Sequence, residues 1–579
     1  MNGIVAGSLK ALLLSCMVVV LAFGCGKKEG SGDLPEPPPI PDLEVTIYAN
    51  GHIVTMDDAQ PEVSAFAVAG GKFIDVGDAE QLRSSYPEAE VIDLQGQTLM
   101  PGVVESHGHL LTLGESFLKL NVMGVETPEE VVAKVKEHLQ TMPKDQWLIG
   151  WGWDDGAWAD SYPTNKLLNE VSPENPVLLD GLHGFACWAN DKALALAGIT
   201  SETQNPESGI IFKHPETDKP TGILKDQAQA LLHEQVPPLD EAQLEKALKL
   251  AIDECVRHGL TSVHEAKSSA AMIKVLQKLK DNNELKSRIY VMLDGAFPEL
   301  IEPYYASGPV IDPEHMLTIR CIKIFVDGAL GSRGAAMLMP YSDAPEEVGE
   351  LVTPEDELYA ITKRALESNL QMAIHAIGDR ANRITLNAFS KALEEVPEAG
   401  DHRLRLEHAQ VVALEDIPQF APLGVVLSMQ PPHATSDMPW AETRIGPNRI
   451  RGAYAWRKFL DTGVHLTLNS DFPGETCNPF SGMYAAMTRQ NAAGEPPGGW
   501  RPQECLERDV VLKAYTIEAA YSGFDEELKG QIKKGMLADF IVLSDDILTI
   551  PPVEFLNLHV KQTYLGGKLV YDLTTDAEK

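Results

Sequence analysis

Two histidines end an apolar segment of the sequence, Pro101-Gly102-Val103-Val104-Glu105-Ser106-His107-Gly108-His109. Alternate residues of a β-strand point to the same side, so His107 and His109 can reach a single metal ion. Three further side chains of metal-binding type each follow an apolar segment directly: His375, His408 and Asp471. Nitrogen and oxygen donors of this kind suit zinc, with iron, manganese or nickel as alternatives. The pattern predicts a site for one or two divalent ions, zinc being the first expectation.

The elements that carry these side chains are predicted to alternate between helix and strand. Eight short apolar segments predict strands, at residues 100–106, 261–264, 288–293, 320–326, 371–374, 403–407, 425–429 and 464–470. One intervening helix begins at Asp240, which with Gln243 resembles a capping arrangement, and another has Pro354 at a first helical position. Eight such units favour an α/β fold with a parallel (β/α)8 barrel of the TIM type. The carboxyl ends of barrel strands meet on one face, and all five candidate ligands fall at those ends.

Both ends of the chain are predicted to add a small β-sandwich-like domain, made of residues 43–98 and 520–579. These segments alternate apolar and polar residues, and Gly566-Gly567 marks a hairpin turn. The barrel domain is assigned to residues 99–519. Within it, residues 113–237 are too many for one barrel helix and predict an inserted subdomain.

The first 25 residues are predicted to be an export signal. A short apolar run ends in Leu21-Ala22-Phe23-Gly24-Cys25, which resembles a bacterial lipobox although Phe23 stands where a small residue is usual. Residues 26–42, rich in Gly and Pro, have the composition of a flexible tether. We expect lipidation of Cys25 and an exported protein that is tethered to the cell envelope and faces the periplasm, with ordinary signal cleavage as the alternative. Gly26 lacks the aspartate of inner-membrane retention, which favours the outer membrane.

Composition limits the partners of this 579-residue chain. A formal net charge of -36 argues against nucleic acid, whose binding relies on Lys and Arg, and favours a small-molecule substrate. Contact with a membrane is expected through the lipid anchor only, and a homodimer is left open. The five cysteines that remain after Cys25 lack zinc-knuckle spacing and are interpreted as mostly buried thiols.

Further motifs join the candidate ligands in a resemblance that runs from Leu43 to Tyr571. They occupy residues 150–155, 220–224, 323–333 and 535–539, the third reading Lys323-Ile324-Phe325-Val326-Asp327-Gly328-Ala329-Leu330-Gly331-Ser332-Arg333. With them the chain resembles the amidohydrolase superfamily, specifically amidohydrolase family 3, in the branch that includes N-substituted formamide deformylase. The resemblance implies that His107 and His109 bind the more buried metal and His375 and His408 the second. It also implies that Asp471 touches the metal and takes the catalytic proton from water.

The resemblance further implies that Lys323 is carboxylated by carbon dioxide and bridges two metals. A bare ammonium would be repelled by two divalent cations, whereas a carbamate offers an oxygen to each. The alternative is an ordinary lysine paired with Asp327.

Candidate substrate contacts are less specific. His183 and His264 match family histidines that could hold substrate or line the pocket, with a structural role as the alternative for each. Arg333 could orient a carbonyl or carboxylate, or form an internal ion pair, and His433 could contact substrate.

Other features bear on the pocket and its selectivity. The tryptophans at 147, 151, 153 and 158 could wall a pocket or form a packed core. The chain departs from the usual family pattern at Glu105, at Gly334 and over residues 472–475, and these departures bear on substrate preference.

The function predicted from the sequence is metal-dependent hydrolysis of a non-peptide carbon–nitrogen bond, in an N-acyl or N-formyl amine or a cyclic amide. The alternatives on the same scaffold are a deaminase, a carbon–oxygen hydrolase or an isomerase, because fold does not fix chemistry. A different class of alternative is a non-catalytic envelope lipoprotein that captures a ligand.

Overall fold

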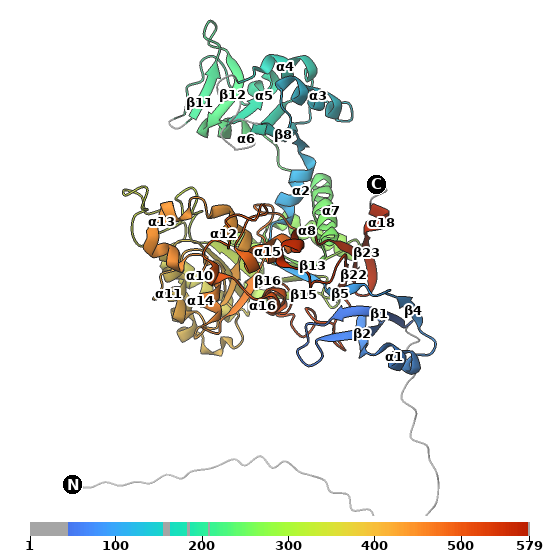
Figure 1. Ribbon diagram of the computed structural model, residues 1–579. Coiled ribbons are helices and arrows are strands. Elements are labelled where there is room, and N and C mark those ends of the chain that lie inside the picture. Colours follow the sequence, from blue (N-terminus) through green and yellow to red (C-terminus); the bar gives the residue numbers. More distant parts are fainter. Residues whose placement is uncertain (1–43, 154–161, 182–185, 207–208, 577–579) are drawn as a thin grey trace, which may run out of the picture. The chain divides into compact units, whose positions relative to one another are not determined.

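The structure is a computed structural model that describes residues 44–153, 162–181, 186–206 and 209–576 (Figure 1). The predicted signal and tether, Cys25, Trp158 and His183 lie outside these residues. Among the described residues, no helix combines the length and the apolar character needed to span a bilayer.

Eight parallel strands form the barrel, and each coincides with a segment that the sequence predicted as a strand. They pair side by side in chain order from β6 to β20. Their bounds are β6 Val103–Gly108, β13 Leu260–Ser268, β14 Arg288–Asp294, β16 Leu317–Phe325, β17 Gln371–Ala376, β18 Arg405–His408, β19 Val426–Met429 and β20 His465–Leu468. The predicted (β/α)8 barrel is confirmed.

The barrel closes between its first and last strands through a few specific contacts. The backbone N–H of Asp471 donates to the His107 carbonyl at 3.0 Å, and that of His109 donates to the Phe472 carbonyl at 2.9 Å. Lower in the barrel, the Thr467 hydroxyl donates to the Ser106 hydroxyl at 2.9 Å. These contacts place the two histidines of β6 beside Asp471.

Amphipathic helices cover the barrel strands. In α7 (Glu241–Arg257) the Asp240 side chain accepts from the Gln243 N–H and the Gln243 side chain accepts in return, which confirms the predicted capping arrangement. Pro354 precedes α10 (Glu355–Glu367) as its N-cap, one residue earlier than predicted, because its ψ of 155° is extended. Other helices between strands are α8 Ala270–Asp281, α9 Pro298–Ser307, α11 Asp379–Glu395, α12 Pro431–Asp437, α13 Ala441–Arg449, α14 Trp456–Leu460, α15 Pro479–Thr488, α16 Arg508–Ala514 and α17 Ile517–Ser522.

A second sheet unites strands from both ends of the described chain. Its order is β23-β22-β21-β5-β1-β2-β3, with β4 also paired to β1. The strands are β1 Thr46–Val54, β2 Glu62–Ala69, β3 Lys72–Gly77, β4 Glu90–Asp93, β5 Thr98–Pro101, β21 Phe540–Leu543, β22 Val560–Leu565 and β23 Lys568–Asp572, with helices α1 Ala79–Ser85 and α18 Leu573–Asp576. An aromatic cluster that includes Tyr48, Phe66 and Phe540 fills its core. Both termini therefore contribute to one β-structure, as the fold prediction stated.

The segment between β6 and α7 forms a third sheet, of order β11-β12-β10-β9-β8-β7. Its strands are β7 Leu120–Asn121, β8 Leu148–Trp153, β9 Val177–Gly181, β10 Ala186–Ala189, β11 Gly209–Lys213 and β12 Pro220–Asp226, and its helices are α3 Pro128–Leu139, α4 Asn165–Val171, α5 Asp191–Leu196 and α6 Ala230–His233. Trp153 is buried there, against Trp188, and its indole N–H donates to the Leu179 carbonyl at 2.9 Å. For Trp153 the packed-core alternative is the one the structure shows.

Candidate metal centre

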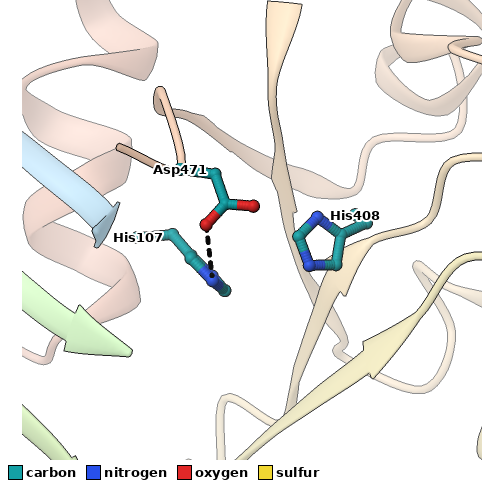
Figure 2. Close-up of side chains that lie close together, drawn as sticks. All are labelled: His107, His408 and Asp471. Carbon is teal, nitrogen blue, oxygen red and sulfur yellow. Dashed lines mark ion pairs between the residues drawn. The ribbon is translucent and has the colours of Figure 1, made fainter. Parts of the chain in front are cut away.

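The predicted ligands converge at the carboxyl ends of the barrel strands. His107, His408 and Asp471 each offer one ligand atom, and these atoms lie within 4.8 Å of one another. Figure 2 shows the Asp471 carboxylate directed at the His107 ring, with His408 beside them. The distance from Asp471 Oδ1 to His107 Nε2 is 3.5 Å. Side chains on β6, on β18 and directly after β20 thus lie close together.

Two further predicted ligands border this point. His109 precedes α2 (Leu110–Leu118), and its Nε2 lies 3.2 Å from Asp471 Oδ1. His375 stands on β17, with its ring centroid 4.5 Å from that of His408. Its Nε2 is buried without a hydrogen-bond partner. The structure therefore brings all five predicted histidine and aspartate ligands together.

Lys323 reaches the same cluster from β16. Its Nζ lies 3.1 Å from His107 Nε2, and the residue is 1 % exposed. The alternative partner, Asp327, instead accepts the backbone N–H groups of Ala336, Ile377 and Gly378. Burial lowers the pKa of Lys323 to about 8. The structure thus does not show the ion pair between Lys323 and Asp327 that was the alternative to carboxylation.

Three imidazoles of the cluster, those of His107, His375 and His408, have lowered pKa values. Burial, reinforced by Lys323, lowers the pKa of His107 to about 4 and that of His375 to about 3. Burial and then the neighbouring His375 also hold the pKa of His408 well below its usual range. Although burial by itself raises the pKa of Asp471, the histidines around it lower that pKa well below its usual range. At neutral pH the imidazoles of His107, His375 and His408 are therefore neutral and the Asp471 carboxylate is ionised, the forms that bind metal.

Buried partners behind the cluster hold the rings in place, and these the sequence analysis missed. His107 Nδ1 lies 2.5 Å from Glu407 Oε2, and Arg405 donates to both oxygens of Glu407. His408 Nδ1 lies 2.8 Å from Gln430 Oε1. Because carboxylate and amide oxygens accept, each ring carries its hydrogen on Nδ1, and its Nε2 has no hydrogen and can offer its lone pair to a metal ion. The available signal was the period of two along β18, which puts residues 405 and 407 on one side.

Two buried glutamates fix the backbone around the ligands. Glu105 accepts from the backbone N–H and the hydroxyl of Ser470, at 2.9 and 3.0 Å, and so ties β6 to the residue before Asp471. Glu265 accepts from the Leu110 N–H at 2.6 Å, directly after His109. Burial raises the pKa of Glu105 to about 8 and that of Glu265 to about 7. Glu105, a departure from the family pattern, therefore positions the strand end.

The donor set fits the metal that the sequence predicts. One ligand atom each of His107, His408 and the ionised Asp471 lies within 4.8 Å of the others. His375 Nε2, which has no hydrogen-bond partner, adds a further donor and lies 3.6 Å from Asp327 Oδ1. They are nitrogen and oxygen donors of the kind zinc accepts, and the outer partners of His107 and His408 are those seen behind metal-binding histidines.

Of the predicted substrate residues that the structure describes, His433 lies at the cluster, whereas His264 and Arg333 contact other side chains. His433 on α12 belongs to the site, with its Nε2 3.8 Å from Asp471 Oδ2 and its ring stacked on His408. His264 is fully buried; its Nδ1 lies 2.9 Å from Arg405 Nη1 and its ring packs on Tyr290. Arg333 donates to both oxygens of Asp343, so it forms the internal ion pair given as its alternative.

All five cysteines among the described residues are free thiols. Cys187, Cys255, Cys321 and Cys477 are buried, and Cys505 is half-buried. This agrees with the interpretation of the sequence.

Comparison with known proteins identifies the family of the chain. Residues 90–571 match the model of the amidohydrolase family. The chain is 33% identical over 535 residues to the putative amidohydrolase YtcJ of Bacillus subtilis, which covers 91% of this chain and 99% of that protein. It is 28% identical over 544 residues to the N-substituted formamide deformylase of Arthrobacter pascens, covering 91% and 98%. The crystal structure of an uncharacterized metal-dependent hydrolase from Pyrococcus furiosus superposes with a TM-score of 0.74 at 27% identity, covering 87% of this chain and all of that one. With most of its length matched to one family and its fold shared with a hydrolase, the chain belongs to the amidohydrolase family.

Proposed function

We propose that this enzyme hydrolyses a non-peptide carbon–nitrogen bond in an N-acyl or N-formyl amine or a cyclic amide, with one or two divalent ions, zinc first. The observation that carries the proposal is the ionised Asp471, with one carboxylate oxygen 3.2 Å from His109 Nε2 and 3.5 Å from His107 Nε2. The family membership and the relationship to a formamide deformylase support the bond class. A bound ion would supply Lewis acidity that activates water and polarises the carbonyl.

The residues that would hold the metal are His107, His109, His375, His408 and Asp471, with Lys323. The neutral rings of His107, His375 and His408 need no deprotonation to act as ligands. Glu407 and Gln430 keep the Nε2 atoms of His107 and His408 directed at the centre.

Asp471 has the charge and position for proton transfer. As an ionised carboxylate it accepts the proton of the attacking water on one oxygen and passes it to the departing nitrogen. His433, 3.8 Å from Oδ2, faces the same carboxylate and is assigned to the substrate side.

Lys323 is assigned as a carbamate. Its amine, with a pKa near 8, adds to carbon dioxide and releases one proton, which leaves an anionic carbamate at the cluster. Its support is the burial of Nζ beside His107 and the commitment of Asp327 to backbone N–H groups.

Other chemistries make distinct predictions. A deaminase releases ammonia, whereas amide hydrolysis releases a substituted amine and an acid, so substrate profiling with ammonia detection separates them. A non-catalytic binding lipoprotein has no need of an ionised carboxylate that bridges two ligand histidines.

Metal analysis of the purified protein tests the proposal. The parent is expected to hold one or two zinc-like ions per chain, and the His107→Ala, His109→Ala double variant to lose them. A His465→Ala, His559→Ala variant, which removes two exposed histidines, serves as the matched control and should keep the parent's metal. A parent that holds no metal would overturn the mechanism.

We also propose that the protein is exported and anchored to the envelope, facing the periplasm, through lipid on Cys25. The support is the sequence of residues 1–42 alone: an apolar run, the lipobox-like Leu21–Cys25 and a Gly- and Pro-rich tether.

A further inference from the structure

A second group of metal-binding side chains lies outside the catalytic cluster. Glu254 stands in the last turn of α7, His258 is its C-cap, and Cys477 lies in the loop between Asp471 and α15. One ligand atom of each lies within 4.8 Å of the others, and His258 Nε2 is 3.1 Å from Glu254 Oε1. In the described part of the chain only this group and the catalytic one have such spacing.

The three side chains form a donor set that zinc prefers. Thiolate, imidazole and carboxylate are its common protein ligands, and donors on a tetrahedral ion lie about 3.4 Å apart for metal–ligand bonds of about 2.1 Å. The Glu254–His258 pair already has this spacing because residues i and i+4 share a helix face. Cys477 Sγ lies within 4.8 Å of a ligand atom of each of the other two residues, so it can complete the set.

The surroundings favour a cation at this point. The group lies at the carboxyl end of a 17-residue helix, where the helix dipole is negative. Cys477 is 6 % exposed, whereas Glu254 and His258 are half-buried, so solvent can reach the group from one side. One opposing charge is present, because Arg257 Nη1 lies 3.3 Å from Glu254 Oε2. That contact uses the other carboxylate oxygen and leaves Oε1 to the ion.

We propose that Glu254, His258 and Cys477 bind a zinc ion, with a solvent molecule in the fourth position. Binding replaces the Glu254–His258 hydrogen bond and releases the Cys477 thiol proton to solvent. The ion links the end of α7 to the loop that begins at Asp471, six residues before Cys477, and so restrains the loop of the proton carrier. The site does not depend on the proposed reaction.

Cobalt titration of the full-length protein tests the site, because only this site contains sulfur. Cobalt bound to a thiolate gives an intense sulfur-to-metal charge-transfer absorption, which the His, Asp and Lys donors of the catalytic centre cannot give. The absorption is expected to reach one equivalent per chain, to persist in the His107→Ala, His109→Ala variant, and to disappear when zinc is added.

Variants at the site and matched cysteine controls decide the assignment. Cys477→Ser should abolish the absorption, and His258→Ala and Glu254→Gln should each weaken cobalt binding by more than about tenfold, since even losing a group that only orients a ligand costs about that much. Two control variants, Cys255→Ala on the same helix and Cys505→Ser, should leave the thiolate absorption unchanged. Circular dichroism melting confirms that each variant is folded. The proposal is overturned if the parent shows no thiolate absorption at saturating cobalt, or if the absorption survives Cys477→Ser.

Discussion

At the scale of single residues, the proposed mechanism gives the oxygens of Asp471 two roles, as a metal ligand and as a proton carrier. Replacement by Asn keeps the size and one oxygen but removes the ionised acceptor. We expect Asp471→Asn to lower kcat by about 10²–10⁴, the usual contribution of a positioned general base. Metal content and the melting temperature should change little, and a variant with parent turnover would exclude the proton-carrier role. Steady-state kinetics on an N-formyl amine, with metal analysis of the same samples, measures both.

If His107 and His375 bind metal as proposed, their depressed pKa values set the pH range over which the metal is held. The pKa values of His107, about 4, and His375, about 3, lie below the usual 6.5, so protons do not compete with metal at these rings until the pH falls toward 4. We expect metal content after dialysis to stay constant from pH 8 to pH 6 and to fall below about pH 5. Loss of half the metal by pH 6 would contradict the neutral-imidazole assignment.

The same pKa shifts also determine how the stability of the metal-free protein changes with pH. Below pH 6.5 the unfolded chain binds protons at these histidines and the folded protein does not, so their contribution to stability is lost as the pH falls from about 6.5 toward 4. The buried Glu105 and Glu265 act in the opposite direction, because their raised pKa values favour the folded state at low pH. The free energy of unfolding therefore changes less steeply with pH than the histidines alone would predict.

At the scale of elements, one buried ion pair joins the barrel to the sheet formed by both ends of the chain. Arg288 on β14 donates to both oxygens of Asp539, at 2.6 and 2.9 Å, and both side chains are almost fully buried. Asp539 Oδ1 also accepts the Gly566 N–H in the turn between β22 and β23. A single carboxylate thus connects a barrel strand, β21 and a hairpin.

Neutralising Asp539 should therefore destabilise the protein strongly. We expect Asp539→Asn to cost about 3–5 kcal/mol, because it leaves a buried guanidinium without its counter-charge. Thermal and urea unfolding of parent and variant measure the loss. The control is Asp253→Asn, which removes the half-exposed pair with the neighbouring Lys286 and should have little effect. Equal effects of the two substitutions would show that Arg288–Asp539 does not hold the sheet to the barrel.

At the scale of the whole molecule, the proposed lipid anchor determines where the enzyme meets its substrate. Cys25→Ser should move the full-length protein from the membrane fraction to the soluble fraction of a bacterial host, since no acyl chain can then be attached. Cys505→Ser is the matched control and should leave the distribution unchanged. Fractionation with immunoblotting measures this, and a Cys25→Ser protein that still sediments with membranes would exclude the anchor.

The barrel strands, and the convergence of the five candidate ligands at their carboxyl ends, could be predicted from the sequence because both signals are local. Each strand is a short apolar run, and each of His107, His109, His375, His408 and Asp471 stands within or directly after such a run, where the geometry of a barrel fixes its side of the fold. The capping of α7 was equally local. The N-cap position of Pro354 was missed by one residue, because a proline is compatible with both positions.

What only the tertiary structure decided are contacts between residues far apart in the chain. Glu407 supports His107 across 300 residues, Arg288 meets Asp539 across 251, and Lys323 lies beside His107 while Asp327 is taken by backbone donors. Cys477 approaches the local pair of Glu254 and His258 only because the fold brings the loop after Asp471 against the end of α7. Local sequence pattern specifies elements and the faces of their side chains, but which faces meet depends on barrel closure and on the packing of the whole core. That is why the candidate ligands could be named from the sequence, whereas the buried partners behind them could not.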